Sequence, residues 1–150
     1  MKGYLLDVSV LLALSWPRHE FHRSVERWFA ANSSKGWATC PMTEAAFVRI
    51  LSSQSFSPRA VTTKEAFDVL ASNAKHPMHQ FWNDDLSLTE AWTDLNVGAI
   101  GPQQVTDAYL LALAIHHGGK LATLDKRLAN FLGSTRERAS LELIPQREFT

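Results

Sequence analysis

The sequence predicts one α/β domain over residues 1–150, in which a parallel sheet of about five strands is covered by helices on both faces. Two observations lead to this prediction. Short apolar segments of strand length alternate with longer segments in which apolar residues recur at helical spacing. The chain of 150 residues suits one well-packed domain but is too short for two, and it contains no repeat or linker.

In the first half of the chain, strand and helix patterns follow one another closely. The opening apolar run ends at Asp7, and the leucine and alanine residues that follow favour a helix. Farther along, Val25 and Trp28 share one helical face. Thr43 is a favoured helix cap, which places Glu44 in a first turn. The predicted elements are a strand Tyr4–Leu6, helices Val8–Leu14 and His19–Ala31, a strand Trp37–Cys40, and a helix that Thr43 caps and that extends to Ser52.

The second half carries two capping patterns and one strongly apolar helix. Thr62 with Glu65, and Ser87 with Glu90, have the spacing at which side chains cap a helix N-terminus. Residues 105–115 are almost uninterrupted in apolar character, so this helix should be the most buried. The predicted elements are a loop 54–60, a helix with Ala66, Phe67, Leu70 and Ala71 on its inner face, a strand His79–Trp82, a helix around Ala91, Trp92 and Leu95, a loop Gly98–Pro102, a helix Val105–Ile115, a strand Leu121–Leu124, a short helix Lys126–Leu132, and a strand Leu141–Ile144.

Composition excludes several classes of protein. Lysine plus arginine equals aspartate plus glutamate at 15 each, so contact with nucleic acid would need a local basic patch. The single Cys40 excludes an internal disulfide and a cysteine-rich zinc site. Asp7 interrupts the apolar start of the chain, which argues against a signal peptide, and no apolar run approaches the roughly 20 residues that span a bilayer. We therefore expect a soluble cytoplasmic protein without a membrane partner.

Four acidic residues are the candidates for chemistry, although each has an ordinary structural explanation. Asp7 and Asp125 follow predicted strands, where an aspartate often caps the next helix. Glu44 and Asp107 lie in first turns, where a negative charge complements the helix dipole. Taken singly, none of the four indicates a function.

The joint placement of these acids indicates a metal site. The carboxyl ends of parallel strands lie at one edge of a sheet, so Asp7 and Asp125 should face the same crevice. Asp107 begins a helix that must pack on the sheet, where uncompensated charge is costly. Carboxylates that converge without cysteine or paired histidine favour a hard cation, Mg²⁺ or Mn²⁺. Such an ion suits the hydrolysis of phosphodiesters.

Four segments of the chain resemble the successive acidic motifs of PIN-domain ribonucleases. They are residues 4–11 (YLLDVSVL), Thr43-Glu44, residues 105–108 (VTDA) and residues 122–128 (ATLDKRL). The segments occur in the order of the family motifs and the match covers essentially the whole chain. Within that family the chain resembles the VapC-type toxins of type II toxin–antitoxin systems.

This resemblance implies a fold, an activity and partners. The fold would be a three-layer α/β/α sandwich around a central parallel sheet, and the activity that of a Mg²⁺- or Mn²⁺-dependent endoribonuclease acting on structured RNA. The chain would form a homodimer and be neutralised by a small antitoxin whose tail fills the acidic groove. In the site, Asp7, Glu44, Asp107 and Asp125 would bind the metal and position the attacking water, and the hydroxyls of Ser9 and Thr106 would support the carboxylates.

Three other functions remain open at this point. A receiver-like signalling domain needs adjacent acids early in the chain, whereas Asp7 has no acidic neighbour and Asp84-Asp85 lies midway. A non-catalytic binding module with the same fold would have no need of four intact acids. A nuclease acting on DNA would carry the same motifs, and only the small size of the chain favours RNA.

The remaining polar and aromatic residues give weaker signals. Arg18 is most simply surface charge, while Lys126 and Arg127 lie close enough to a motif to contact a phosphate. Histidine pairs at one-turn spacing, His19 with His22 and His76 with His79, lack the cysteine partners or the HExxH pattern of a zinc site. Among the tryptophans, only Trp16 and Trp82 are candidates for an RNA or dimer surface, and neither is favoured.

Overall fold

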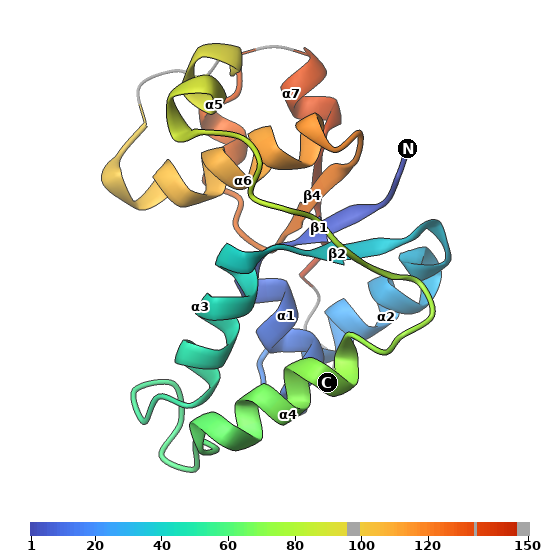
Figure 1. Ribbon diagram of the computed structural model, residues 1–150, viewed down its shortest axis with the longest axis vertical. Helices are drawn as coiled ribbons and strands as arrows, with labels where there is room; N and C mark the ends of the chain where they lie inside the picture. The colour runs from blue at the N-terminus through green and yellow to red at the C-terminus, as the bar shows by residue number, and fades with distance from the viewer. Residues whose placement is uncertain (96–99, 134, 147–150) are drawn as a thin grey trace.

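The computed structural model describes residues 1–95, 100–133 and 135–146, and in it five parallel strands form one sheet (Figure 1). Every neighbouring pair of strands is parallel, and the order across the sheet is β3-β2-β1-β4-β5. The strands are β1 (Tyr4–Leu6), β2 (Trp37–Thr39), β3 (His79–Phe81), β4 (Lys120–Thr123) and β5 (Leu141–Leu143). The predicted parallel sheet of five strands is confirmed, with strand ends that differ from the predictions by one residue at most.

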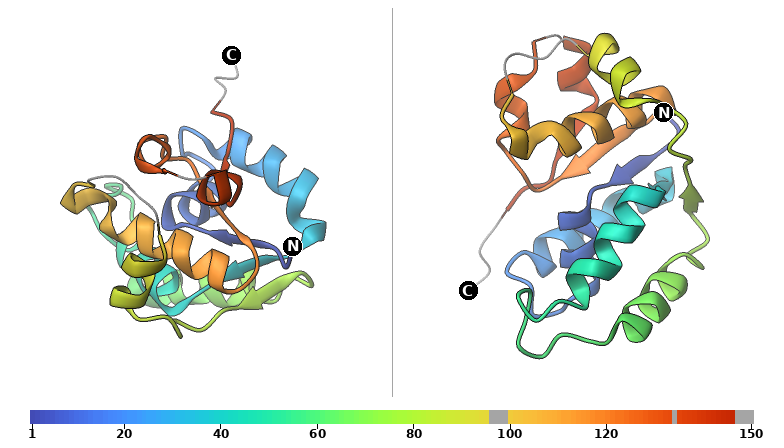
Figure 2. Two further views of the ribbon diagram at one scale, coloured as in Figure 1. Left: turned by 90° about the horizontal axis from the view of Figure 1, so that it is seen from above. Right: turned by 60° about the vertical axis from the view of Figure 1, so that its left-hand side comes forward.

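Helices cover both faces of this sheet, as the α/β/α prediction requires (Figures 1 and 2). The first four helices pack on one face, and α5 and α6 pack on the other. The helices are α1 (Val8–Ser15), α2 (His22–Asn32), α3 (Pro41–Leu51), α4 (Thr63–Asn73), α5 (Leu88–Asp94), α6 (Val105–His116) and α7 (Thr135–Ala139). In the described part of the chain, no helix is long and apolar enough to cross a membrane.

The central strand β1 separates two apolar cores. Side chains of a strand alternate between the faces of the sheet, so Leu5 packs in the core with α5 and α6, while Tyr4 and Leu6 pack in the core with α1 and α3. Residues 108–114 of α6 are all buried, which confirms that this helix is the most enclosed. A strand that is apolar on both faces belongs in the middle of a covered parallel sheet.

Two helices begin at positions other than those predicted. Helix α3 begins at Pro41, not after Thr43, because proline already has the backbone angle of a first helical residue. Cys40 is the N-cap in place of Thr43, and Thr43, the third residue of the helix, accepts a hydrogen bond from the Cys40 amide through its hydroxyl at 3.0 Å. Helix α2 begins at His22, three residues later than predicted, because a turn forms in which His19 Nδ1 accepts from the Phe21 amide at 3.0 Å.

Other local predictions were incomplete. The Thr62–Glu65 capping box is confirmed by its two reciprocal hydrogen bonds. Only Ala66 of the predicted inner face of α4 is buried, while Phe67 is 60% exposed, because α4 packs through a narrow strip. The segment after β4 is a 3₁₀ helix, Leu128–Phe131, and α7 was not anticipated. Pro102 begins another 3₁₀ helix, whereas residues 98 and 99 of the predicted loop lie outside the described residues.

Candidate active site

The strand order predicts a ligand site between β1 and β4. From β1 the chain builds outward through β2 to β3 and then returns to the other side of β1 with β4, so the direction of building reverses between these two strands. In sheets of this kind the ligand crevice lies at that reversal, beyond the carboxyl ends of the strands. Asp7 follows β1 there, and Asp125 lies two residues beyond β4.

Asp7 serves as a helix cap and as the centre of a buried polar cluster at once. It is 4% exposed, and its Oδ1 accepts hydrogen bonds from the Val10 amide at 3.0 Å and from the Ser9 hydroxyl at 2.5 Å. Its Oδ2 accepts a short hydrogen bond from the Thr123 hydroxyl. Burial raises the pKa of Asp7 even though these hydrogen bonds oppose the shift. A buried carboxylate of this kind gains from a cation beside it.

Thr123 is a residue that the sequence reasoning missed. It is the last residue of β4 and is 1% exposed. Its hydroxyl donates to Asp7 and accepts from the Asp125 amide at 3.0 Å, so it fixes the two acids relative to each other. The alternation of side chains along β4 could have placed it on the same face as Asp125, but the partner across the strands is not readable from sequence.

Asp107 lies in the first turn of α6 and faces the other two aspartates. The pKa of Asp107 is raised to about 6, mainly by burial and further by the negative charges of Asp7 and Asp125, while the positive charge of Arg127 opposes the shift. Each proximate carboxylate disfavours ionisation of the next, so the shift indicates that the three share one region. Asp7, Asp107 and Asp125 are therefore brought together by the fold, and we call these three residues the acidic cluster.

Asp125 is bound to an arginine from its own loop. The Arg127 guanidinium contacts the Asp125 carboxylate with Nη2 at 2.9 Å and Nε at 3.1 Å, and its Nη1 donates to Gln103 Oε1 at 3.3 Å. These hydrogen bonds lower the pKa of Asp125. Of the three basic candidates, Arg127 is thus held at the acidic cluster, while Lys126 is exposed beside it.

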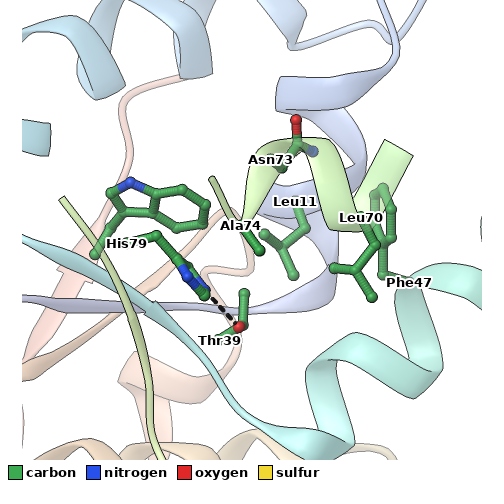
Figure 3. Close-up of a pocket in the computed structure, with 8 residues that line it drawn as sticks. Leu11, Thr39, Phe47, Leu70, Asn73, Ala74 and His79 are labelled. Carbon is green, nitrogen blue, oxygen red and sulfur yellow. Dashed lines mark hydrogen bonds between the residues drawn. The ribbon is translucent and has the colours of Figure 1, made fainter. Parts of the chain in front are cut away.

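Glu44 lies at the same edge of the sheet but follows the neighbouring strand, β2, and its carboxylate is held by different groups. It is in the first turn of α3, after β2. Glu44 Oε2 accepts a hydrogen bond from the Thr39 hydroxyl at 2.7 Å, and the same hydroxyl lies 2.8 Å from His79 Nε2 (Figure 3). Thr39 is the last residue of β2 and His79 the first of β3. From sequence, His79 is a candidate only as a disfavoured zinc ligand and Thr39 is not a candidate, because their pairing depends on the register of two strands.

The two predicted supporting hydroxyls have different surroundings. Ser9 contacts Asp7 directly, whereas Thr106 is exposed at the start of α6. Among the described residues, the Thr106 hydroxyl makes no hydrogen bond to the four acids. The catalytic roles of both hydroxyls stay predictions.

The acidic residues fit a hard cation in chemistry, but they are not arranged around one as they stand. Within the described ranges, no group of three or more His, Cys, Asp or Glu side chains has the arrangement of a metal site. The Asp125 carboxylate pairs with Arg127, and the Glu44 carboxylate accepts a hydrogen bond from Thr39. The oxygen donors and the raised pKa of Asp107 still match Mg²⁺ or Mn²⁺.

Comparison with known proteins agrees with this architecture. The family model described as PIN domain matches residues 4–132. Ribonuclease VapC39 of Mycobacterium tuberculosis is 43% identical over 126 residues, covering 84% of this chain and 91% of the relative. Ribonuclease VapC38 of the same organism is 41% identical over 140 residues, covering 93% and 96%.

Two solved structures share the fold at low sequence identity. One is the M. tuberculosis VapC20 structure, described as a Sarcin-Ricin loop cleaving toxin, with a TM-score of 0.60 at 15% identity, covering 87% of this chain and 97% of that one. The other is VapBC2 from Rickettsia felis bound to a DNA fragment from its promoter, also with a TM-score of 0.60 at 15% identity, covering 95% and 98%. At this identity the likeness concerns the fold alone.

Proposed function

This chain belongs to the PIN-domain family, and from that premise we propose that it is a Mg²⁺- or Mn²⁺-dependent endoribonuclease that hydrolyses phosphodiester bonds in RNA. The observation that carries the proposal is the meeting of Asp7, Asp107 and Asp125 at the carboxyl edge of the sheet, with the pKa of Asp107 raised to about 6. Relatives at 41–43% identity that are named ribonucleases support the substrate class.

Each acidic residue has a distinct place in this proposal. Asp7 accepts three hydrogen bonds and would supply a firmly held ligand. Asp107 would add a ligand from α6, Asp125 one from the loop after β4, and Glu44 one from α3. When bound, the divalent cation would polarise the phosphodiester and lower the pKa of the attacking water. Ser9 holds Asp7, and Arg127 stands at the rim, where a guanidinium suits an RNA phosphate.

We also propose that the chain acts as the toxin of a toxin–antitoxin pair in the cytoplasm. The support is its similarity to VapC proteins and its fold likeness to a VapBC assembly. A groove between α3 and α4 begins at Glu44 and is lined by apolar side chains that include Val48, Phe67 and Leu70. An antitoxin tail that follows this groove would reach Glu44.

A homodimer is the last part of the proposal. Three apolar side chains on α5 and the start of α6 are more than one-third exposed: Leu88 at 55%, Trp92 at 55% and Val105 at 41%. They line one shallow apolar depression, here called the α5–α6 patch, with Thr89 and Thr93. Exposed apolar side chains that gather in this way mark contact surfaces, and a second copy of the chain is the partner we expect.

The cleavage proposal is tested with purified protein and a structured RNA, with Mg²⁺, Mn²⁺ or chelator present. We expect cleavage only with a divalent ion, and a loss of at least 100-fold in rate for Asp7→Asn, since one ligand becomes neutral. Asparagine caps helices as well as aspartate does, so the fold should survive. Asp68→Asn is the matched control, because Asp68 is an exposed acid on α4 that pairs with Lys64 at 3.1 Å.

Three outcomes would contradict this proposal. Binding of RNA without cleavage would indicate a non-catalytic module. Faster cleavage of DNA than of RNA would indicate a DNA nuclease. Undiminished cleavage by Asp7→Asn would exclude the acidic cluster as the site. Sequencing of RNA ends after controlled expression, with and without the product of the neighbouring gene, tests the pairing with an antitoxin.

A further inference from the structure

The hydrogen bonds around Thr39 connect Glu44 to a histidine on the edge strand. The Thr39 hydroxyl lies between Glu44 Oε2 at 2.7 Å and His79 Nε2 at 2.8 Å. Thr39 is 1% exposed, so these are its principal polar contacts in a buried position. Figure 3 shows the His79 ring pointing from β3 toward Thr39, beside a cavity that α1, α3 and α4 close.

The direction of these hydrogen bonds follows from counting protons. A hydroxyl has one proton, and an ionised carboxylate can only accept, so Thr39 donates to Glu44. The His79 Nε2 must then carry a proton and donate it to the Thr39 oxygen. Burial lowers the pKa of His79, which keeps the ring neutral near neutral pH. A neutral ring has a single N–H, and the contact with Thr39 assigns it to Nε2, in competition with a hydrogen bond between the ring and the Ala74 backbone.

Packing holds the ring in the orientation that this chain of hydrogen bonds needs. The His79 ring contacts Trp37 with centroids 4.7 Å apart, and Trp37 is itself only 2% exposed. The register of the sheet pairs Trp37 with His79 and Thr39 with Phe81. The ring therefore has little freedom to turn away from Thr39, and the Thr39 hydroxyl has little freedom to turn away from Glu44.

We propose that His79 is a positioning residue for the nuclease site, acting on Glu44 through the Thr39 hydroxyl. The inference rests on the proposed function, in which Glu44 is a metal ligand. His79 itself touches neither metal nor RNA. By donating to Thr39 it aligns the hydroxyl proton on Glu44 Oε2 and leaves Oε1 as the oxygen available to a cation. Groups that orient a ligand in this way raise metal affinity and activity.

The first test measures Mn²⁺ affinity by isothermal titration calorimetry for His79→Phe and His79→Gln. Phenylalanine keeps the aromatic contact with Trp37 but has no N–H, so affinity should fall about tenfold. Glutamine has an amide N–H that can reach Thr39, so it should restore affinity close to that of the wild type. The Mn²⁺ concentration that half-saturates cleavage should follow the same order, while the KM for RNA stays constant.

A double-mutant cycle separates positioning from a general loss of structure. If His79 acts through Thr39, the pair Thr39→Val and His79→Phe should weaken Mn²⁺ binding little more than Thr39→Val alone. Additive losses, or a failure of His79→Gln to restore affinity in a protein that melts like the wild type, would overturn the inference.

A third measurement does not depend on metal binding or cleavage. Nitrogen NMR of the histidine rings in the metal-free wild type should show His79 as the Nε2–H tautomer, and Thr39→Val should disturb it. An Nδ1–H tautomer in the wild type would overturn the inference whatever the activity of the protein. Wild-type protein that shows the Nε2–H tautomer but takes up no Mn²⁺ would instead overturn the proposed metal dependence.

Discussion

At the scale of single residues, Asp107 links the site to the stability of the fold. Its pKa is raised to about 6 in the folded protein, against about 3.9 in an unfolded chain. At a pH below both pKa values, Asp107 is protonated in the folded and in the unfolded protein and does not change the free energy of unfolding. Between them the unfolded chain releases its proton first, so stability of the metal-free protein falls as pH rises and stays lowered above about pH 6.

Asp107→Asn should therefore stabilise the metal-free protein while abolishing cleavage. We expect a gain of about 1–2 kcal/mol at neutral pH, after allowing for solvent screening of a group that is only partly buried. The gain should vanish near pH 4, where Asp107 is protonated in the wild type as well. Thermal melts at both pH values measure the difference, and saturating Mn²⁺ should reverse it at neutral pH by stabilising the wild type alone. A variant that melts below the wild type at neutral pH would contradict the prediction.

The residues of the site differ in how far sequence could identify them. Asp7 was weighed as a helix cap against a metal ligand, and the cap is confirmed by the Val10 hydrogen bond, while the metal role stays a proposal. Ser9 follows from the resemblance of residues 4–11 to a family motif, and its hydroxyl contacts Asp7. Thr123 and His79 were not identified as site residues, because their partners come from other strands and only the sheet register brings them together.

At the scale of secondary structure elements, β1 and β4 approach closely at Gly3, which precedes β1, and Gly119, which precedes β4. A side-chain carbon added to Gly119 would lie 2.4 Å from the Gly3 carbonyl oxygen and 2.5 Å from the Trp82 ring. The same Gly3 carbonyl accepts the Lys120 amide at 3.0 Å, so it cannot move without loss of a sheet hydrogen bond. This contact lies at the amino ends of the strands, opposite the acidic cluster.

Gly119→Ala should destabilise the protein by about 1–3 kcal/mol, because the added methyl group forces strand β4 or Trp82 to shift. Urea unfolding measures the change. Gly101→Ala is the control, since its added carbon meets no backbone atom and only the Gln104 side-chain oxygen that accepts from the Gly101 amide, so it should cost less. Cleavage per folded molecule should be unchanged for Gly119→Ala, and a large loss of activity at full folding would show that the two edges of the sheet are coupled.

The elements themselves were largely predictable, and their ends were not. The predicted strands agree with all five observed strands to within one residue. The buried strands β1, β2 and β4 are apolar on both faces, whereas the edge strands β3 and β5 are only partly buried. Helix starts failed where a competing local structure formed, as with the turn before His22. The inner face of α4 was wrong at Phe67 because periodicity does not show how wide a strip the neighbouring helix covers.

At the scale of the whole molecule, the formal net charge is zero, so association with a partner depends on local surfaces and not on overall charge. Trp92 is 55% exposed in the α5–α6 patch, although Trp82, which sequence reasoning had placed among the surface candidates, is buried and stacked on His117. Trp92→Glu places a charge in the proposed dimer contact and should shift the protein from dimer to monomer in size-exclusion chromatography with light scattering. Phe67→Glu is the matched control, because Phe67 is equally exposed but lies on α4. A monomeric wild type, or dissociation by Phe67→Glu alone, would contradict the assignment.

The position of β1 in the middle of the sheet has a consequence for synthesis of the chain on the ribosome. β1 is made first, yet it pairs with β4, and Asp7 meets Thr123 across a separation of 116 residues. When β1, β2 and β3 have emerged from the ribosome, the nascent chain still lacks Asp107, Asp125 and the Thr123 hydroxyl that donates to Asp7. The acidic cluster therefore cannot form while most of the polypeptide is being translated, and the translating ribosome does not carry an assembled nuclease at its own exit.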